Sequence, residues 1–231
     1  MKNAIALFIG LVLSASSLGA ASNTKELEKA TDVLSDIMRA PDRGIPSDLL
    51  AKAVCVGVVP SELKVAFGIG GTFGHGVLVC RRGGDGAWGA PSMFTLGGAS
   101  VGFQIGGEAT DLVFLVTNPD GAKKLLQDSV RLGADISAAA GPVGRSASGA
   151  TDVQLRAEIL SYSRSRGLFA GVSLNGAVLK QDHDENARLY GRPLSAKDIL
   201  IRGEVATPPA ARPLDHLLMR YAPRGGAPFA V

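Results

Sequence analysis

The sequence is short of charge imbalance and of aromatic side chains, and each shortage excludes a class of protein. Its 231 residues carry a formal net charge of only +3. The acids and bases are interspersed, which argues against a dedicated nucleic-acid binder. Aromatic residues make up 5% of the chain, too few to build the stacking platforms that hold single-stranded nucleic acids. The length suits one domain with a sizeable core.

Long apolar runs are also missing after the N-terminal segment. The apolar residues Ala4–Leu13 follow Lys2 and precede the small-residue run Ser14–Ser22, which is the three-part form of a secretory signal. The apolar part is too short to span a bilayer. We expect residues 1–21 to be a signal peptide and the mature protein to be periplasmic or envelope-associated. The alternative is a buried N-terminal core helix.

Motifs for metals and nucleotides are lacking as well. No HExxH or CxxC motif is present, and His75, His183 and His216 lie far apart in the sequence. The acidic run 182–186 lacks the glycine and glutamate of a calcium loop, so we expect a polar turn there. The glycines of 68–76 are followed neither by Gly-Lys-Ser/Thr nor by a helix, which excludes a phosphate loop. We expect no metal and no cofactor.

One enzyme-like motif is present at residues 98–102. The sequence GASVG matches GxSxG, the pattern around the nucleophile of many hydrolases, with Ser100 at its centre. That motif needs a strand before the serine and a helix after it. The residues that follow, VGFQIGG, alternate as a strand does. An ordinary serine in a glycine-rich strand is therefore favoured over a serine hydrolase.

The two cysteines, Cys55 and Cys80, leave one question open. In an exported protein two cysteines can form a disulfide, and both of these lie in apolar, strand-like runs. Each can equally be a small buried hydrophobic residue. The sequence does not give the Cα separation that pairing requires.

A helical pattern covers residues 24–40. The polar face of this segment mixes acids with bases, whereas helices that lie on lipid favour a basic face, so we expect the helix to dock on the core. The apolar face consists of Leu27, Ala30, Leu34, Ile37 and Met38.

Shorter helices are expected in three further segments. Ser47–Ala53 has Ser47 as its cap, Asp120–Asp128 begins at Asn118-Pro119, and Leu214–Tyr221 lies in a segment rich in Pro, Ala and Arg. We assign residues 22–203 to the main domain and 204–231 to a C-terminal tail, whose last residues we expect to be loosely attached.

Strand patterns dominate from Val54 onward. In residues 65–80 bulky residues alternate with small ones, which fits either two strands joined by a turn near Gly70–Gly74 or one long bent strand. The same alternation recurs at 93–107 and at 167–180, and the apolar run 111–118 is typical of a strand covered on both faces. We predict an α+β fold with a strongly bent or closed, mostly antiparallel sheet.

Basic residues flank these strands. If the strand ends converge, the basic side chains line one rim and bind a phosphorylated head group; the alternative is scattered surface cations. Arg164 and Arg166 lie two residues apart in an extended segment, so they project to the same face. Asp111, Glu158 or a lipid phosphate would lie between them. The candidate head-group residues are Lys64, Arg81, Arg82, Arg164 and Arg166.

Four blocks of the sequence resemble one family. AFGIGGTFGHGVLV, WGAPSMFTLGGASVGFQIGGEATDLVFLVTN, LGADISAAAGPVGR and EILSYSRSRGLFAGVSLNGAVL are similar to the SYLF (Ysc84-like) domain, over roughly residues 24–203. The resemblance implies a lipid-binding module rather than an enzyme. Phosphoinositides are the ligands reported for eukaryotic members, some of which also bind and bundle actin.

Together these features predict a non-enzymatic phospholipid-binding module of the bacterial envelope. The phosphoinositide-type head group is carried over from the family. The alternative is a structural or interaction protein that offers a sheet edge to a protein partner. The oligomeric state is not determined by the sequence.

Overall fold

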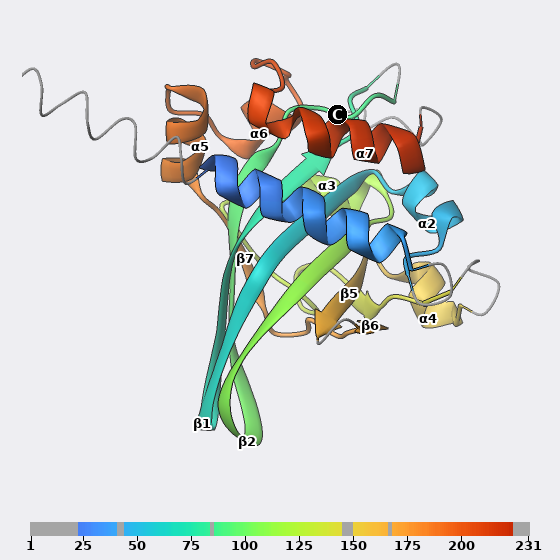
Figure 1. Ribbon diagram of the computed structural model, residues 1–231, viewed down its shortest axis with the longest axis vertical. Helices are drawn as coiled ribbons and strands as arrows, with labels where there is room; N and C mark the ends of the chain where they lie inside the picture. Colours follow the sequence, from blue (N-terminus) through green and yellow to red (C-terminus); the bar gives the residue numbers. More distant parts are fainter. Residues whose placement is uncertain (1–22, 41–43, 84–85, 145–149, 166–167, 224–231) are drawn as a thin grey trace, which may run out of the picture.

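The computed structural model describes residues 23–40, 44–83, 86–144, 150–165 and 168–223 (Figure 1). Within residues 62–70 and 99–108, and at 155, 165, 168 and 169, it describes only the backbone. The expected signal peptide and Arg166 lie outside the described residues. None of the helices in these ranges has the length and apolar character needed to cross a membrane.

A long antiparallel ribbon of two strands, β1 (Cys55–Cys80) and β2 (Ser92–Val116), forms the centre of the fold. The strands pair from Cys55 opposite Val116 to Leu78 opposite Ser92. A straight strand of 26 residues would span roughly 85 Å. The Cα atoms of Cys55 and Cys80, at opposite ends of β1, nevertheless lie only 4.0 Å apart. The ribbon therefore folds back on itself, as Figure 1 shows.

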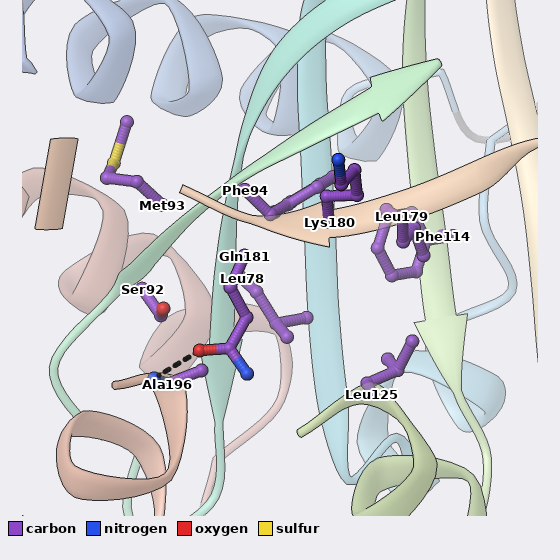
Figure 2. A pocket seen from close by; sticks show the side chains of 10 residues that line it. All are labelled: Leu78, Ser92, Met93, Phe94, Phe114, Leu125, Leu179, Lys180, Gln181 and Ala196. Carbon is purple, nitrogen blue, oxygen red and sulfur yellow. Dashed lines mark hydrogen bonds between the residues drawn. The ribbon is translucent and has the colours of Figure 1, made fainter. Parts of the chain in front are cut away.

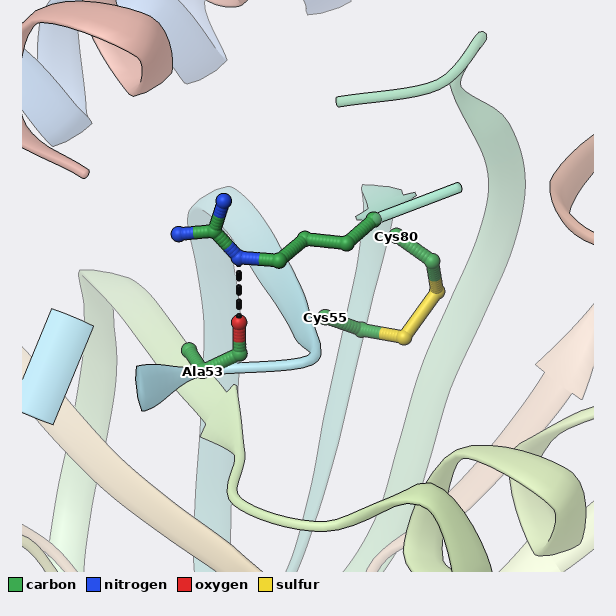
Figure 3. The surroundings of a disulfide bond; sticks show 4 residues. Ala53, Cys55 and Cys80 are labelled. Carbon is green, nitrogen blue, oxygen red and sulfur yellow. Dashed lines mark hydrogen bonds between the residues drawn. A yellow bond between two sulfur atoms is a disulfide. The ribbon is translucent and has the colours of Figure 1, made fainter. Parts of the chain in front are cut away.

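This geometry resolves two questions that the sequence leaves open. β1 continues through Gly70–Gly74 as one bent strand rather than as two strands joined by a turn. Cys55 and Cys80 form a disulfide with an S–S distance of 2.03 Å (Figure 3). The disulfide joins the two ends of one strand, so it holds the folded ribbon closed at its base.

Two irregularities in the pairing of β1 with β2 bend the ribbon. Between Val59 and Glu62, β1 holds two residues opposite a single residue of β2. These two are Pro60, which has no N–H to donate, and Ser61, whose φ is 56°. At the fold-back, β1 has one residue between its paired positions 67 and 69, whereas β2 has the three residues 102–104. Such bulges bend and twist the strand that carries them.

Five short strands extend the ribbon into a seven-stranded sheet. β5 (Ile159–Ser165) pairs with the second half of β2, and β7 (Val178–Gln181) pairs with the first half. The remaining strands are β3 (Ser129–Arg131) beside β7, and β4 (Ala138–Ala140) and β6 (Leu168–Gly171) beside β5; only the β4–β5 pair is parallel. The predicted α+β fold with a bent, mostly antiparallel sheet is confirmed.

Helices cover both faces of the sheet at the base of the ribbon. One apolar cluster joins the sheet to the helix 23–38, to α2 (Ser47–Lys52) and to α7 (Arg212–Tyr221). A second cluster joins the other face to α3 (Pro119–Leu125) and α6 (Ala196–Leu200). The short helices α4 (Asp152–Arg156), α5 (His183–Tyr190) and η2 (Pro209–Ala211) complete the described body.

The row of small residues in the ribbon has a packing role at its base. Gly57 lies opposite Phe114, and Gly76 lies opposite Phe94. A Cβ atom on Gly57 or Gly76 would lie 2.0 or 2.4 Å from the Cζ atom of the facing ring. The two rings contact each other edge to face, with centroids 5.6 Å apart. Glycine at these two positions therefore makes room for an aromatic pair in the core.

Several sequence predictions are confirmed. The helix 23–38 docks on the core through its apolar face, and Leu112–Val116 are buried as expected for a strand covered on both faces. Asn118 caps α3, because its side chain accepts a hydrogen bond from the N–H of Gly121. The acidic run, by contrast, is not the expected polar turn: Asp182 caps α5, and residues 183–186 are the first residues of that helix.

Three further predictions need correction. Ser47 is not a cap, because Pro46 occupies the cap position of α2 and no side-chain cap bond is present. Residues 167–180 do not form one strand, since residues 172–177 separate β6 from β7. The segment after residue 203 is part of the folded body as far as Ala222, because α7 buries Leu214 and Leu218 in the core.

Candidate functional site

The basic residues predicted to line one rim lie at separate places in the described structure. Arg81 and Arg82 follow the end of β1, whereas Arg164 lies on β5. Lys64 is on β1, opposite Glu108, in the part where only the backbone is described. Arg166 is outside the described residues. No shared basic rim is formed by those whose side chains are described.

Arg81 is completely buried. Its guanidinium donates five hydrogen bonds of 2.8–3.2 Å, all to backbone carbonyl groups: those of Ala51, Ala53, Gly86, Ala222 and Pro223. Figure 3 shows the bond to Ala53 beside the disulfide. An arginine side chain has five N–H donors, so none is left for a lipid phosphate. The side chain also stacks on Trp88, 4.3 Å from the ring centroid.

The backbone around Arg81 compensates its charge. Ala51 and Ala53 lie at the C-terminal end of α2, and Ala222 and Pro223 follow the end of α7. Carbonyl groups at helix C-termini carry partial negative charge. Burial nevertheless lowers the pKa of Arg81 from its ordinary value, since desolvation disfavours the charged form. Arg81 thus joins the C-terminal ends of α2 and α7 to the connection between β1 and β2. Its contacts indicate a role in stabilising the fold.

Arg164 belongs to a network of ion pairs. Its Nη1 lies 2.5 Å from Oδ2 of Asp36 on the helix 23–38, and 3.7 Å from Oδ2 of Asp111, the residue opposite it on β2. Oδ1 of Asp111 accepts a hydrogen bond of 2.9 Å from the N–H of Ser61 in the bulge of β1. Asp111 is one of the partners expected from the sequence; Glu158 instead contacts Lys124.

Beyond this network the ribbon extends as an arm, which we define as residues 65–72 of β1 and 98–107 of β2. These segments pair with each other, from Val65 opposite Gly107 to Thr72 opposite Gly98. Within the described residues no further strand pairs with the arm, since β5 ends its pairing at Asp111 and β7 at Gly97. In Figure 1 the arm points away from the helices, along the longest axis of the molecule.

The arm carries no charged residue. Its two segments read VAFGIGGT and GASVGFQIGG, and they contain apolar residues, glycine, and the uncharged polar residues Thr72, Ser100 and Gln104. Whichever way the individual side chains face, the surface of the arm is therefore uncharged. An uncharged, largely apolar extension without covering elements is a feature of surfaces that meet a partner or a membrane.

Charged residues begin again at the base of the arm. Lys64 and Glu108 face each other immediately before it, and the Arg164 network follows. On the returning half, Phe73 is 53% exposed and packs edge-on against His75, with ring centroids 5.0 Å apart. Nδ1 of His75 lies 3.4 Å from Oδ2 of Asp182. The arm is thus bordered by a charged belt, which contains the bases Lys64 and Arg164 and the acids Asp36, Glu108, Asp111 and Asp182, with His75 beside Asp182.

Cavities in the described body offer little for chemistry. One between the halves of the ribbon has a volume of only about 20 Å³, and the side chains of Gln181 and Leu179 reach into it (Figure 2). A larger cleft of about 290 Å³ is lined by residues from α2 to β5, including Lys52 and Leu160. No group of His, Cys, Asp and Glu residues suited to a metal ion occurs among the described residues.

Ser100 does not have the setting of a hydrolase nucleophile. It lies opposite Gly70 within β2, and that strand continues to Val116. A nucleophile elbow requires a sharp turn from strand into helix at the serine. The backbone at Ser100 therefore fits the glycine-rich strand that the sequence favours.

The fold and the arm define an α+β domain built on a folded-back ribbon. Residues 97–221, more than half of the chain, match the Ysc84 family, described as "Las17-binding protein actin regulator". The chain belongs to this family, which confirms the resemblance to the SYLF domain.

Full-length relatives are known in fungi and animals. LAS seventeen-binding protein 3 of Saccharomyces cerevisiae is 36% identical over 213 residues, covering 87% of this chain and 46% of the yeast protein. SH3 domain-containing protein PJ696.02 of Schizosaccharomyces pombe is 42% identical over 177 residues, covering 75% of this chain and 40% of the relative. SH3 domain-containing YSC84-like protein 1 of Homo sapiens is 35% identical over 205 residues, covering 85% of this chain and 59% of the human protein. The chain spans about half the length of these relatives. Their names are not those of enzymes, which agrees with a non-enzymatic protein.

Sequence reasoning missed the arm as a separate feature. The signal for it was present, because positions 65–74 and 92–107 lack any charged residue. What the sequence did not show is that the parts 65–72 and 98–107 of these runs lie opposite each other and extend beyond the helices. Each run alone resembles an ordinary buried strand.

Proposed function

We propose that this protein is a non-enzymatic module that binds the surface of anionic phospholipid membranes. The observation that carries the proposal is the charge pattern of the ribbon: an uncharged arm beyond a charged belt in which the basic residues Lys64 and Arg164 take part. A membrane surface presents phosphate groups above an apolar layer, so the arm matches the apolar layer, and Lys64 and Arg164, but not the four acids of the belt, match the phosphates. Membership of the Ysc84 family is consistent with this proposal.

The compartment is part of the same proposal. The signal-like N-terminus favours export, and the Cys55–Cys80 disulfide suits an oxidising compartment such as the periplasm. In that setting the membrane would be an envelope membrane, and the head group would be an anionic phospholipid available there. A phosphoinositide-type head group is the form that the family resemblance suggests.

Vesicle flotation tests the proposal directly. The chain from Ser22 onward is mixed with vesicles of phosphatidylcholine alone, or of phosphatidylcholine and phosphatidylglycerol in equal parts. We expect flotation with the anionic vesicles at low salt and less flotation as salt rises, because screening weakens surface electrostatics. Absence of flotation with every composition at low salt would refute the function.

A matched pair of lysine variants locates the electrostatic contribution. A basic residue near an anionic surface contributes about 1 kcal/mol, so we expect Lys64→Gln to weaken vesicle binding roughly fivefold. Lys197→Gln removes an exposed lysine from α6, in the body rather than at the belt, and should leave binding unchanged. Equal losses in both variants would assign the effect to net charge rather than to the belt.

A second function, binding of a protein partner, is favoured by one specific observation. Both strands of the arm have an edge without a neighbouring strand in the described structure, and such edges accept an added strand from a partner. The yeast relative is named as a Las17-binding protein. Crosslinking in envelope preparations, with photoreactive residues placed in the arm, would detect such a partner.

A further inference from the structure

We infer that the arm enters the membrane tip first, that its tip stops at the boundary between head groups and acyl chains, and that Lys64 at its base stays at the level of the phosphates. This inference rests on the proposed membrane binding and deepens it. It assigns the contact to one part of the chain, residues 65–72 and 98–107, and it sets a depth.

The length of the arm fits this depth. Four residues separate Lys64 from position 68 at the fold-back, which corresponds to about 13 Å of extended strand. The polar head-group region on each side of a bilayer is roughly 5–7 Å thick. The arm is therefore longer than the head-group region is thick, and it enters at a tilt that leaves Lys64 among the phosphates and brings the tip to the head-group end of the acyl chains.

The absence of charge permits this entry. No side chain among the 18 residues of the arm has to lose the hydration of a charge when the arm leaves water. Phe67, Phe103 and Ile105 are apolar residues whose backbone lies at or next to the fold-back. Phe73, at the base of the returning half, is already 53% exposed, as expected of a residue that another surface covers.

The open edges of the arm limit how deeply it can enter the membrane. Neither strand of the arm has a second neighbour in the described structure, so each carries backbone N–H and C=O groups along an unpaired edge. The hydrocarbon core offers these groups no hydrogen-bond partner, and open sheet edges do not occur there. Water and polar atoms are still present at the head-group boundary. The arm therefore lies in the interface and does not span the bilayer.

A tryptophan reporter tests the inference. The only native tryptophan, Trp88, is buried in the body and bonded to Ala222, so lipid-borne quenchers should leave its emission unchanged. Phe103→Trp adds a second tryptophan at the fold-back. The matched control, His216→Trp, adds one to an exposed position on α7. The vesicles contain phosphatidylglycerol and phosphatidylcholine in equal parts, with the phosphatidylcholine brominated either near the head-group end or near the methyl end of its chains.

We expect Phe103→Trp to lose at least about twice as much emission to head-group-end bromine as to methyl-end bromine, because quenching needs close contact at a shallow depth. Neither His216→Trp nor the parent protein should be quenched. Thermal unfolding curves of both variants establish that they are folded, and Phe67→Trp is the substitute if Phe103→Trp is not.

The outcomes separate this inference from the proposed function. Flotation without quenching of Phe103→Trp, or with equal quenching of His216→Trp, would overturn the role of the arm and leave membrane binding intact. Stronger quenching by methyl-end bromine would overturn the depth. A vesicle-independent dimer that Ile69→Asp abolishes would assign the arm to a second copy of the chain instead. Failure to float at all would remove the proposed function together with the inference.

Discussion

Arg81 and Arg82 show how far two adjacent, identical residues can differ. Successive residues of a strand face opposite sides, so at the end of β1 one side chain enters the body and the other faces water. Arg81 is buried under five carbonyl groups, whereas Arg82 is exposed. The sequence identifies both as basic residues flanking a strand. It does not reveal that two helix ends from distant parts of the chain converge on one of them.

We predict that Arg81→Lys is strongly destabilising. Lysine has three donors at one point, so it leaves several of the five carbonyl groups, three of which are in buried bonds, without their present partner. Hydrogen bonds to charged groups contribute about 1.5–3 kcal/mol each, and unsatisfied buried groups add to the loss. We expect the free energy of unfolding, measured by urea denaturation, to fall by about 3 kcal/mol or more.

Arg82→Lys is the matched control for this prediction. The exposed side chain has no comparable set of bonds, so its replacement should change stability by less than about 0.5 kcal/mol. Similar losses in both variants would mean that the hydrogen bonds of Arg81 contribute little beyond its charge.

At the scale of elements, Glu158 joins three segments that are separate in the sequence. Its carboxylate contacts Lys124 of α3 at 2.9 Å and accepts hydrogen bonds from the backbone and side chain of Ser137, next to β4. Glu158 itself directly precedes β5. Burial alone would raise the pKa of Glu158, but the bonds from Lys124 and Ser137 outweigh burial and hold the pKa below its ordinary value.

The lowered pKa of Glu158 gives a pH-dependent prediction. A carboxylate whose pKa is lower in the folded state contributes stability above its unfolded pKa of about 4.3, and loses it as pH falls through the folded pKa. We expect Glu158→Gln to reduce the free energy of unfolding by about 1–2 kcal/mol at neutral pH. The difference from the parent protein should shrink as the pH is lowered below about 4. Urea denaturation across this range measures it.

Glu28→Gln serves as the control for Glu158. Glu28 is exposed on the helix 23–38, so its replacement should have little effect at either end of the pH range. A Glu158→Gln difference that is constant with pH would show that the loss comes from packing or from neutral hydrogen bonds rather than from the charge.

The elements that were predictable from the sequence are those with strong local signals. Asn118-Pro119 marks the start of α3, and the apolar spacing of residues 24–40 marks the first helix, because capping and periodicity are local properties. Residues 167–180 were misassigned because their alternation of small and large side chains continues through the 172–177 connection. At Gly171 the small residue has a different purpose: a Cβ there would lie 2.1 Å from the carbonyl oxygen of Gly141. No local pattern reports such a tertiary contact.

At the scale of the whole molecule, the sequence determined a bent sheet but not how it bends. A turn near Gly70–Gly74 and a continuous bent strand require the same local pattern of glycine and bulky residues. Contacts between residues far apart in the sequence decide between them. These contacts are the disulfide, the hydrogen bond from the N–H of Arg81 to the carbonyl of Val54, and the packing of Gly57 and Gly76 against Phe114 and Phe94. That the uncharged residues form a projecting arm can be deduced only once the fold-back is known.

The fold-back gives the last prediction, which concerns the disulfide. Cys55 and Cys80 are 25 positions apart and both are buried, so Cys55→Ala with Cys80→Ala removes the bond without burying a polar group. A cross-link that closes a loop of this length contributes about 3 kcal/mol, chiefly by restricting the unfolded chain. We expect a loss of that size in urea denaturation, and the same loss for the reduced parent protein.

Because β1 remains paired with β2 along its length and Arg81 still joins the helix ends at the base, the double variant should keep the same far-ultraviolet circular dichroism and should still float with anionic vesicles. Loss of flotation by a variant that remains folded would show that the disulfide positions the arm as well as stabilising the body.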